Sequence, residues 1–379
     1  MKKVLILASV ASMIDQFNMM NIDILIKMGY EVHVAANFKQ GSTSSKKRVE
    51  EFEKELKIMK IPFFHVDFSR KLIDFKANTK AFIQVKNLMV KNKYEFVHCH
   101  SPIGGVCGRL AGYKTKTRVI YTAHGFHFFK GAPMKNWSLY YPIEKWLARF
   151  TDILITINKE DYSIAKKSFK AKKIEYVPGI GVDTSKVIPY LEKDKKKSEL
   201  KITKDTIIIL SVGELSKRKN HEVIIKALAK IKHLNISYLI CGYGDLDGYL
   251  KKLSNDLGVY DKVEFLGFRK DIAEICLAAD LFVFPSKQEG LPVAMMEAML
   301  AGLPVVCSKI RGNTDLIEDG RNGYLVEVDD IDGYKDCMNK LIGNDELRRE
   351  MGLHNSIDIA KYDKEVVNKK MKKIYSEMI

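Results

Sequence analysis

Short runs of mostly apolar residues alternate along this chain with longer segments of mixed character. In the first half the runs lie at 4–9, 31–36, 63–68, 96–100, 118–123 and 153–157, and in the second half at 206–213, 237–241, 263–268, 281–284 and 305–306. A continuous apolar run of this length is typical of a strand that is buried on both faces, as in a parallel sheet. Because helical patterns separate the runs, the sequence predicts an α/β protein with doubly wound parallel sheets.

The segments between the apolar runs predict helices. A loop is expected over Ser9–Asp15, followed by a helix to about Lys27 that Gly29 ends. Three further helices are expected within 40–60, over 74–92 and over 363–379. The first apolar run is about eight residues long, too short for a membrane span, and we interpret it as a strand rather than a targeting segment. A chain of 379 residues exceeds one ordinary core, so two domains are expected.

One stretch places two carboxylates around a strand, a loop and a helix. The run 281–284 predicts a buried strand, Pro292 fits the first turn of a helix, and Gly302 ends that helix. Glu289 then falls in the loop and Glu297 one to two turns inside the helix. At about 1.5 Å per helical residue, their carboxylates are expected on the order of 10 Å apart along the axis.

The backbone between the two carboxylates is suited to an anion. It comprises Gly290, Leu291, Pro292 and Val293, whose N–H groups, except that of the proline, lie where a helix N-terminus attracts phosphate. A phosphate site with a carboxylate for hydroxyl groups on either side matches a nucleotide-diphosphate sugar. The same spacing also fits an ordinary amphipathic helix with two solvated glutamates.

The full string from Glu289 to Val306 resembles the Glu-seven-Glu motif of the retaining glycosyltransferases with the GT-B fold, glycosyltransferase family 4. The segment 312–323 is similar to the same family, and the likeness runs along nearly the whole chain. In the first half, 121–129 and 158–162 resemble transferases that build capsule and exopolysaccharide repeat units in bacteria. The resemblance implies two Rossmann-like parallel-sheet domains that face a cleft.

The resemblance also implies where the domains divide. The segment 174–183 resembles the last strand and hinge before the family's second domain, and the Lys-rich run 192–197 is interpreted as a surface element. We therefore expect an acceptor-binding domain over 1–185, a domain that binds the nucleotide-sugar over 186–362, and a C-terminal helix over 363–379 that crosses back to the first domain.

For the second domain the resemblance implies a donor site. Glu297 is expected to hold the ribose hydroxyls, and Glu289 the hydroxyls of the transferred sugar. Arg218 and Lys219 align with the family's basic pair and are expected to stabilise the charge that develops on the diphosphate. Glu214 departs from the pattern, because many members have arginine at that position.

Four more residues complete the expected site. Gly242 belongs to a G-x-G turn, and Phe268 and Arg269 lie in the loop that meets the base in the family. His124 follows the strand at 118–123, and the carboxyl ends of strands are where open α/β sheets place their sites. Position and resemblance together predict His124 as a cleft residue with a catalytic role. The first loop lacks the Gly-Gly pair of many members.

No metal or cofactor is expected. His98 and His100 share one face of a strand, without a third ligand at zinc spacing. Asp245 and Asp247 form a D-x-D sequence that binds Mn²⁺ in other glycosyltransferases, but here they begin a helix, where aspartate is favoured. The six cysteines have no paired spacing, which indicates reduced thiols of a cytosolic protein. The nucleotide-sugar, expected to be UDP-linked, would be a co-substrate.

The charge is unevenly distributed. Residues 1–200 hold 36 basic and 19 acidic side chains, a net charge of +17, whereas residues 201–379 hold 27 and 28. A basic half is compatible with nucleic acid, with an anionic membrane, or with a generally Lys-rich composition. Because the donor is expected in the neutral half, we predict a second anionic partner: the inner face of the cell membrane, which would present a lipid-diphosphate-linked acceptor. No nucleic-acid partner is expected.

The predicted function is therefore that of a retaining glycosyltransferase, peripheral at the cytoplasmic side of the membrane. One alternative is a nucleotide-sugar epimerase of the same fold, which needs further acid or base residues and no acceptor. Another is a basic protein without enzymatic activity that binds membrane or nucleic acid, which leaves Glu289 and Glu297 without a role.

Overall fold

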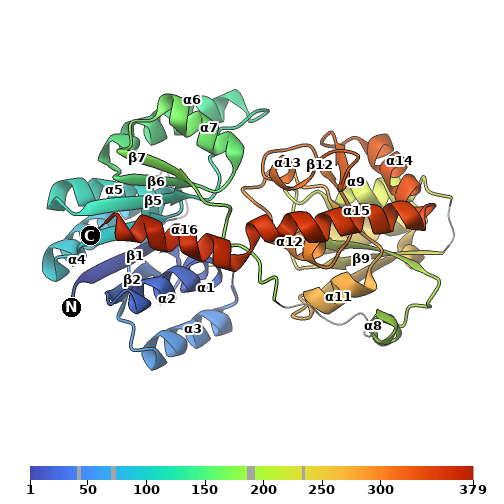
Figure 1. The fold of residues 1–379 in the computed structure, drawn as a ribbon, viewed down its shortest axis with the longest axis horizontal. Helices are drawn as coiled ribbons and strands as arrows, with labels where there is room; N and C mark the ends of the chain where they lie inside the picture. Colours follow the sequence, from blue (N-terminus) through green and yellow to red (C-terminus); the bar gives the residue numbers. More distant parts are fainter. Residues whose placement is uncertain (41–43, 70–73, 186–192, 233–234, 379) are drawn as a thin grey trace. The chain divides into compact units, whose positions relative to one another are not determined.

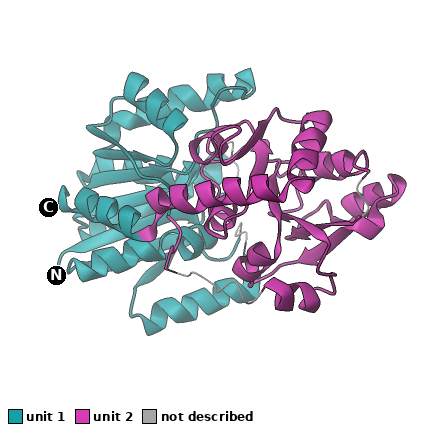
Figure 2. Cartoon of the chain, turned by 45° about the vertical axis from the view of Figure 1, so that its right-hand side comes forward, with its two compact units in different colours: residues 1–180, 365–379 teal, residues 181–364 magenta. Residues whose placement is uncertain are grey.

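The computed structural model describes residues 1–379 except 41–43, 70–73, 186–192, 233–234 and 379. The described residues form two compact units. Unit 1 comprises residues 1–180 and 365–379, and unit 2 comprises residues 181–364 (Figure 2). None of the described helices is long and apolar enough to cross a membrane.

Unit 1 is built on a seven-stranded parallel sheet of order β3-β2-β1-β4-β5-β6-β7 (Figure 1). Its strands are β1 (Lys3–Val10), β2 (Glu31–Asn37), β3 (Phe63–His65), β4 (Phe96–His100), β5 (Arg118–Ala123), β6 (Ile153–Thr156) and β7 (Lys173–Tyr176). Its α-helices are α1 (Ala11–Phe17), α2 (Met19–Lys27), α3 (Lys46–Ile58), α4 (Phe75–Asn92), α5 (Pro102–Thr115), α6 (Met134–Leu147), α7 (Lys159–Ser168) and α16 (Lys364–Ser376), whose first residue belongs to unit 2.

Helices cover both faces of this sheet. Val4 and Ile6 of β1 pack in one core with residues of α2, α3 and α16, whereas Leu5 and Leu7 pack in a second core with residues of α4 and α5. Tyr375 of α16 lies in the first of these cores. Burial on both faces explains why this strand is a continuous apolar run in the sequence.

Unit 2 is built on a six-stranded parallel sheet of order β10-β9-β8-β11-β12-β13. Its strands are β8 (Ile207–Val212), β9 (Ile236–Cys241), β10 (Val263–Gly267), β11 (Leu281–Phe284), β12 (Val305–Ser308) and β13 (Gly323–Val326). Its α-helices are α8 (Lys193–Glu199), α9 (His221–Leu228), α10 (Asp247–Asp256), α11 (Ile272–Ala278), α12 (Val293–Leu300), α13 (Asn313–Leu316), α14 (Ile331–Ile342) and α15 (Asp345–Asp358).

The strand orders fix where each unit places its loops. In unit 2, β8 and β11 are neighbours although two strands of the sheet separate them in sequence, and in unit 1 the same holds for β1 and β4. The order of strands reverses at these points, and ligands of open α/β sheets bind outside the carboxyl ends of the strands there. Two parallel-sheet, Rossmann-like units confirm the predicted α/β fold class.

Two local predictions were wrong. The loop expected over Ser9–Asp15 is not a loop, because β1 continues to Val10 and α1 begins at Ala11. The polar side chains suggested a loop, but Ser12 is buried in the helix together with Ile14. Ser12 therefore lies on the inner face of α1.

Glu192 of the Lys-rich run 192–197 lies outside the described residues, and the described part, 193–197, is not simply a surface element. Lys196 and Lys197 of α8 are buried. The Lys196 ammonium contacts the Asp271 carboxylate at 3.0 Å, and Lys197 donates to the backbone carbonyl of Thr206 at 2.9 Å. Buried ammonium groups need such partners. Asp271 lies far from α8 in the sequence, and Thr206 contributes only a backbone carbonyl. The composition of the run therefore did not reveal either partner.

Candidate functional site

The segment that carries the two glutamates has the predicted strand–loop–helix form. The β11 strand ends at Phe284, and α12 begins at Val293, so Pro292 is the residue before the first helical turn rather than its first member. No side chain caps this helix start, and no acidic residue lies in its first turn. The N–H groups there are thus available to an anion.

Neighbouring residues fix the loop before α12. The Arg311 guanidinium is buried and donates through Nε to the backbone carbonyl of Glu289 at 3.0 Å. Gly312 adopts φ +79°, and a Cβ atom at this position would lie 2.3 Å from the carbonyl oxygen of Gly290. Only glycine fits such a backbone approach. The segment after β12 therefore sets the path of the loop that presents Glu289.

Glu289 binds both predicted cations. Its Oε1 accepts from Arg218 Nη1 at 2.9 Å and from Lys219 Nζ at 2.7 Å. The side chains of Glu289 and Lys219 are only 10% and 13% exposed, whereas that of Arg218 is 44% exposed. The Lys219 ammonium also lies 4.5 Å from the centre of the Phe284 ring. The structure thus brings three predicted residues into one cluster, which depends on the pairing of β8 with β11.

The electrostatic state of Lys219 is sensitive to its surroundings. Burial is the largest influence and lowers its pKa, and the neighbouring Arg218 charge lowers it further. The Glu289 carboxylate acts in the opposite direction and favours the charged ammonium. An anion bound beside Lys219 would favour the charged form in the same way.

Glu297 lies on α12, one turn after Val293, and is half-buried. It is close enough to Cys276 to affect that thiol, whose pKa is raised first by burial and then by the Glu297 charge. The two glutamates therefore lie on either side of the uncapped helix start, one in the loop and one on the helix, as the spacing predicted.

The remaining predicted residues of unit 2 lie at the carboxyl ends of β9 and β10. A Cβ atom on Gly242 would lie 1.9 Å from the carbonyl oxygen of Gly213, so this glycine allows two loops to pack closely. The exposed ring of Phe268 stacks on the exposed ring of Tyr243, with centroids 6.4 Å apart. Arg269 is paired with Asp271 through two hydrogen bonds of 2.8 and 2.5 Å.

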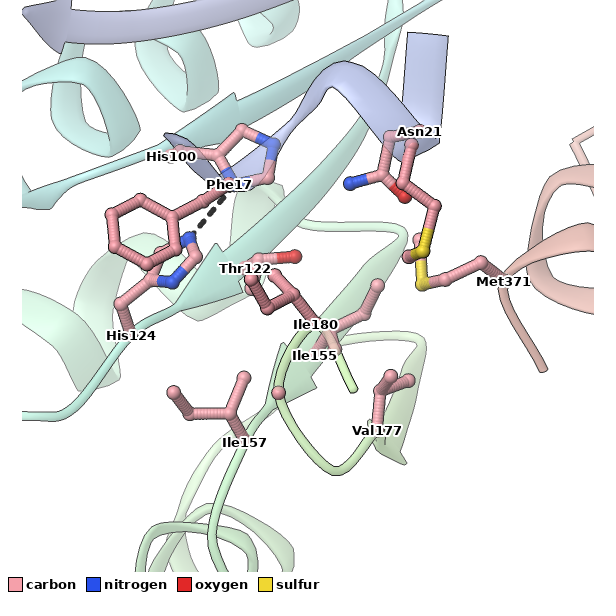
Figure 3. A pocket seen from close by; sticks show the side chains of 12 residues that line it. Phe17, Asn21, His100, Thr122, His124, Ile155, Ile157, Val177, Ile180 and Met371 are labelled. Carbon is pink, nitrogen blue, oxygen red and sulfur yellow. Dashed lines mark hydrogen bonds between the residues drawn. The ribbon is translucent and has the colours of Figure 1, made fainter. Parts of the chain in front are cut away.

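His124 belongs to unit 1, where it lines a pocket (Figure 3). Its Nε2 lies 3.0 Å from Nδ1 of His100, and the Phe17 ring lies beside it with centroids 6.0 Å apart. His98 bonds on one side to Thr122 and on the other to Tyr375 of α16, at 2.8 and 2.9 Å.

All three histidines titrate well below their usual range. Burial lowers the pKa of His124 to about 4 and that of His98 to about 3, and it also lowers the pKa of His100 well below its ordinary value. They are therefore neutral at neutral pH. Among the described residues, no group of three or more His, Cys, Asp or Glu side chains is arranged to hold a metal ion.

Two residues of the unit 2 site were missed in the sequence. Tyr243 stands between two glycines directly after β9, and its exposed ring lies at the carboxyl end of that strand. Arg311 directly precedes Gly312, the glycine with positive φ. Arg311 belongs to no motif that was used, and Tyr243 occupies the variable position of the G-x-G turn, so only their places beside strand ends were available as signals.

Comparisons with known proteins give matches along the whole chain. The family model described as glycosyl transferases group 1 matches residues 192–355, and that described as glycosyl transferase 4-like matches residues 3–158. A Bacillus subtilis (strain 168) protein, provisionally named glycosyltransferase EpsD, is 35% identical, with 99% of this chain and 96% of that protein covered. The Escherichia coli UDP-Gal:alpha-D-GlcNAc-diphosphoundecaprenol alpha-1,3-galactosyltransferase is 33% identical, with 71% of this chain and 76% of that protein covered.

Solved structures show the same fold. Anabaena Alr3699/HepE in complex with UDP-glucose superposes with a TM-score of 0.79 at 20% identity, over 100% of both chains. WaaG, a glycosyltransferase involved in lipopolysaccharide biosynthesis, superposes with a TM-score of 0.72 at 17% identity, over 98% of this chain and 99% of that chain. The chain therefore belongs to the group 1 glycosyltransferases and has their GT-B fold.

Proposed function

We propose that the protein transfers a hexose or N-acetylhexosamine from a UDP-sugar to a saccharide acceptor linked to a lipid diphosphate, with retention at the anomeric carbon. The process would be the assembly of capsule or exopolysaccharide repeat units. One observation carries the donor part of the proposal. Glu289 and Lys219, both largely buried, form a cluster with the more exposed Arg218 beside the uncapped start of α12. The acceptor part is supported by the E. coli relative, whose name specifies a diphosphoundecaprenol-linked acceptor.

The cations and the helix start would bind the donor diphosphate. Two positive side chains and a helix N-terminus neutralise a developing negative charge without a metal ion. Lys219 is suited to this role because burial disfavours its charge until an anion lies nearby. In the free protein Glu289 supplies that negative charge, and in the complex the diphosphate would supplement it.

The base and the ribose would occupy the neighbouring surface. Tyr243 and Phe268 offer two exposed, stacked rings at the ends of β9 and β10, which suits a nucleobase. Gly242 permits close approach of the backbone there. Glu297 would accept the ribose hydroxyls, and Glu289 would accept hydroxyls of the transferred sugar. His124 is neutral and would contribute a hydrogen bond rather than a charge.

In the proposed transfer step, the acceptor attacks the face of the sugar from which the diphosphate leaves. The bond between the anomeric carbon and the diphosphate oxygen breaks while the acceptor oxygen forms its bond on the same face of the sugar. The leaving phosphate oxygen takes the proton of the acceptor hydroxyl, so no separate protein base is required. UDP leaves with that proton, and the product keeps the anomeric configuration of the donor.

The membrane part of the proposal rests on α4. Its outer face exposes three apolar side chains at helical spacing, Phe75, Ile83 and Val90. Lysines flank them at positions 76, 80, 86 and 91, with Lys93 just beyond the helix. Lys80 is engaged by Asp67 at 2.8 Å. Apolar side chains among basic ones are typical of a helix that lies on an anionic membrane surface.

A transfer assay tests the function. The purified chain is mixed with UDP-sugars, ranked beforehand by thermal shift, and with a short-chain α-N-acetylglucosaminyl diphosphate lipid, and UDP release is measured. Release that requires the acceptor and persists in chelator supports the proposal. Sugar isomerisation without acceptor would instead support the epimerase, and chelator inhibition reversed by Mn²⁺ would return Asp245 and Asp247 to consideration.

Lys219→Met provides the matched test of the cluster, with Lys217→Met as its control. Lys217 is an exposed lysine two residues earlier in the same loop. Both variants lose one positive charge, but only Lys219 contacts Glu289. Turnover should fall strongly in the first variant and change little in the second. Equal effects would mean that the loop acts through its general charge rather than through this cluster.

A further inference from the structure

Unit 1 contains a second pocket, distinct from the one in Figure 3, and His124 lines both. We name it the Glu144 pocket; its lining includes Met13, Ser101, Tyr121, Tyr140 and Glu144. The space inside it, open mouth included, is about 510 Å³. It lies beside the carboxyl ends of β4 and β5, where this fold places its sites.

The carboxylate in this pocket is unusual for its surroundings. Between residues 101 and 150 the chain holds eight Lys and Arg residues but a single acidic one, Glu144. The Glu144 residue is only 8% exposed, and its Oε2 accepts from Nη1 of the buried Arg109 at 2.7 Å. Arg109 also donates to the Gly105 carbonyl and stacks on the Tyr121 ring, 4.0 Å from its centre. This guanidinium therefore fixes the carboxylate and balances its charge.

Glu144 retains capacity to bind a ligand. From the described residues, its Oε1 receives only the long hydrogen bond of the Tyr121 hydroxyl, at 3.3 Å. A carboxylate has about four acceptor positions, and the described side chains that donate to Glu144 fill two of them. Hydroxyl groups of a ligand in the pocket would satisfy the others. Because a carboxylate only accepts, such a ligand must bring donors rather than an anionic group.

The walls of the pocket fit a sugar ring. The rings of His127 and Tyr140 stack with centroids 4.5 Å apart and an interplanar angle of 22°, and both line the pocket. Ser101 lines it with φ +63°, a strained backbone conformation for a residue other than glycine. Its Oγ receives the backbone N–H of Ser9 at 3.0 Å. Strain of this kind persists where the surrounding structure holds a residue in place.

We infer that the Glu144 pocket binds an uncharged pyranose ring of the acceptor, with Glu144 accepting its hydroxyl groups and Tyr140 contributing to the wall. The inference rests on the proposed function for the identity of the ligand as the acceptor. Glu144 and Tyr140 would then be binding residues that determine which acceptor is used. The acceptor's diphosphate and lipid would lie outside this pocket, because its only fixed ionic group offered to a ligand is negative.

Methyl NMR of the full chain tests the site without requiring turnover. The Met13 methyl group lines the Glu144 pocket, whereas Met20 and Met371 line the other pocket and serve as internal controls. A panel of neutral methyl glycosides is titrated, with inorganic pyrophosphate as the anionic comparison. At least one glycoside should shift Met13 in a saturable manner while pyrophosphate does not. If no glycoside moves the Met13 signal, or if pyrophosphate moves it as strongly, the inference is wrong.

Two variants connect the pocket to the acceptor. Glu144→Gln should weaken the glycoside response at least about tenfold and raise the KM for the acceptor, with the KM for the UDP-sugar unchanged. Tyr140→Leu keeps the Arg109–Glu144 pair and should raise the same KM; Tyr113→Leu on the exposed face of α5 is the control. Unchanged acceptor KM in both pocket variants would overturn the inference. A normal Met13 response in a chain that never transfers sugar would instead refute the proposed function and leave the pocket assignment standing.

Discussion

Substitution of the two motif glutamates by glutamine should change UDP binding in opposite ways. In the free protein, Glu289 accepts hydrogen bonds from Arg218 and Lys219 at 2.9 and 2.7 Å. A diphosphate bound to the same cations would lie on their other side, so the carboxylate and the phosphate would be about 6 Å apart. At an effective dielectric constant of roughly 40, between the values for a protein surface and water, their repulsion is about 1.4 kcal/mol.

Glu289→Gln removes that repulsion. UDP affinity should therefore stay the same or rise by up to about tenfold. Glu297→Gln removes a charged acceptor of the ribose hydroxyls, and a hydrogen bond to a charged group contributes about 1.5–3 kcal/mol. UDP affinity should therefore fall about 10- to 150-fold. Turnover should fall in both variants. Glu297 is proposed to hold the ribose of the donor, and Glu289 is proposed to hold the transferred sugar.

Isothermal titration calorimetry with UDP measures both effects directly. The Lys217→Met variant serves as a control for loop charge, because this exposed side chain lies outside the Glu289 cluster. A parallel loss of UDP affinity in the two glutamate variants would refute the division of roles. So would a loss confined to Glu289→Gln, because that carboxylate would then contribute to the nucleotide site itself.

Three further predictions follow from the packing and the charges. The free energy of unfolding of unit 1 should fall as the pH drops from about 6.5 to 4.5. Burial lowers the pKa values of His98, His100 and His124, so the unfolded chain binds about three more protons than the folded chain in this range, and the loss is up to about 4 kcal/mol per pH unit. A flat pH profile of thermal unfolding would contradict this. Gly312→Ala should weaken UDP binding about tenfold or more, because its Cβ would lie 2.3 Å from the Gly290 carbonyl, whereas Gly320→Ala, with the same φ of +79° and no atom within 4 Å, should not. The triple variant K76E/K86E/K91E should lose co-sedimentation with anionic vesicles at low salt while UDP affinity persists, and equal binding to neutral and anionic vesicles would exclude an electrostatic surface.

Much of the fold was predictable because parallel strands are buried on both faces. The runs that became β1 and β8 are apolar at nearly every position, and turn residues such as Gly29 and Gly302 mark where the helices end. Polar residues inside helices were the source of a wrong prediction. Ser12 is buried in α1, and its burial depends on packing that the local sequence does not reveal.

Residues of the site were predictable only where a motif identified them. Glu289 lies 71 residues after Arg218 and 70 after Lys219 in sequence, and it meets them because β8 and β11 are neighbours in the sheet. Glu144 belongs to no motif that was recognised, and Tyr243 occupies the variable position of the G-x-G turn. Their significance comes from a stacked ring and a buried guanidinium, which are properties of tertiary structure.

Stereochemistry of the product tests the central claim most directly. The chain is incubated with a UDP-α-sugar and an α-N-acetylglucosaminyl diphosphate lipid, and the new glycosidic linkage is assigned from its anomeric proton coupling by NMR. The account predicts an α-linked disaccharide, formed in proportion to the UDP released and absent in the Lys219→Met variant. A β-linked product, or UDP release without any new linkage, would contradict it.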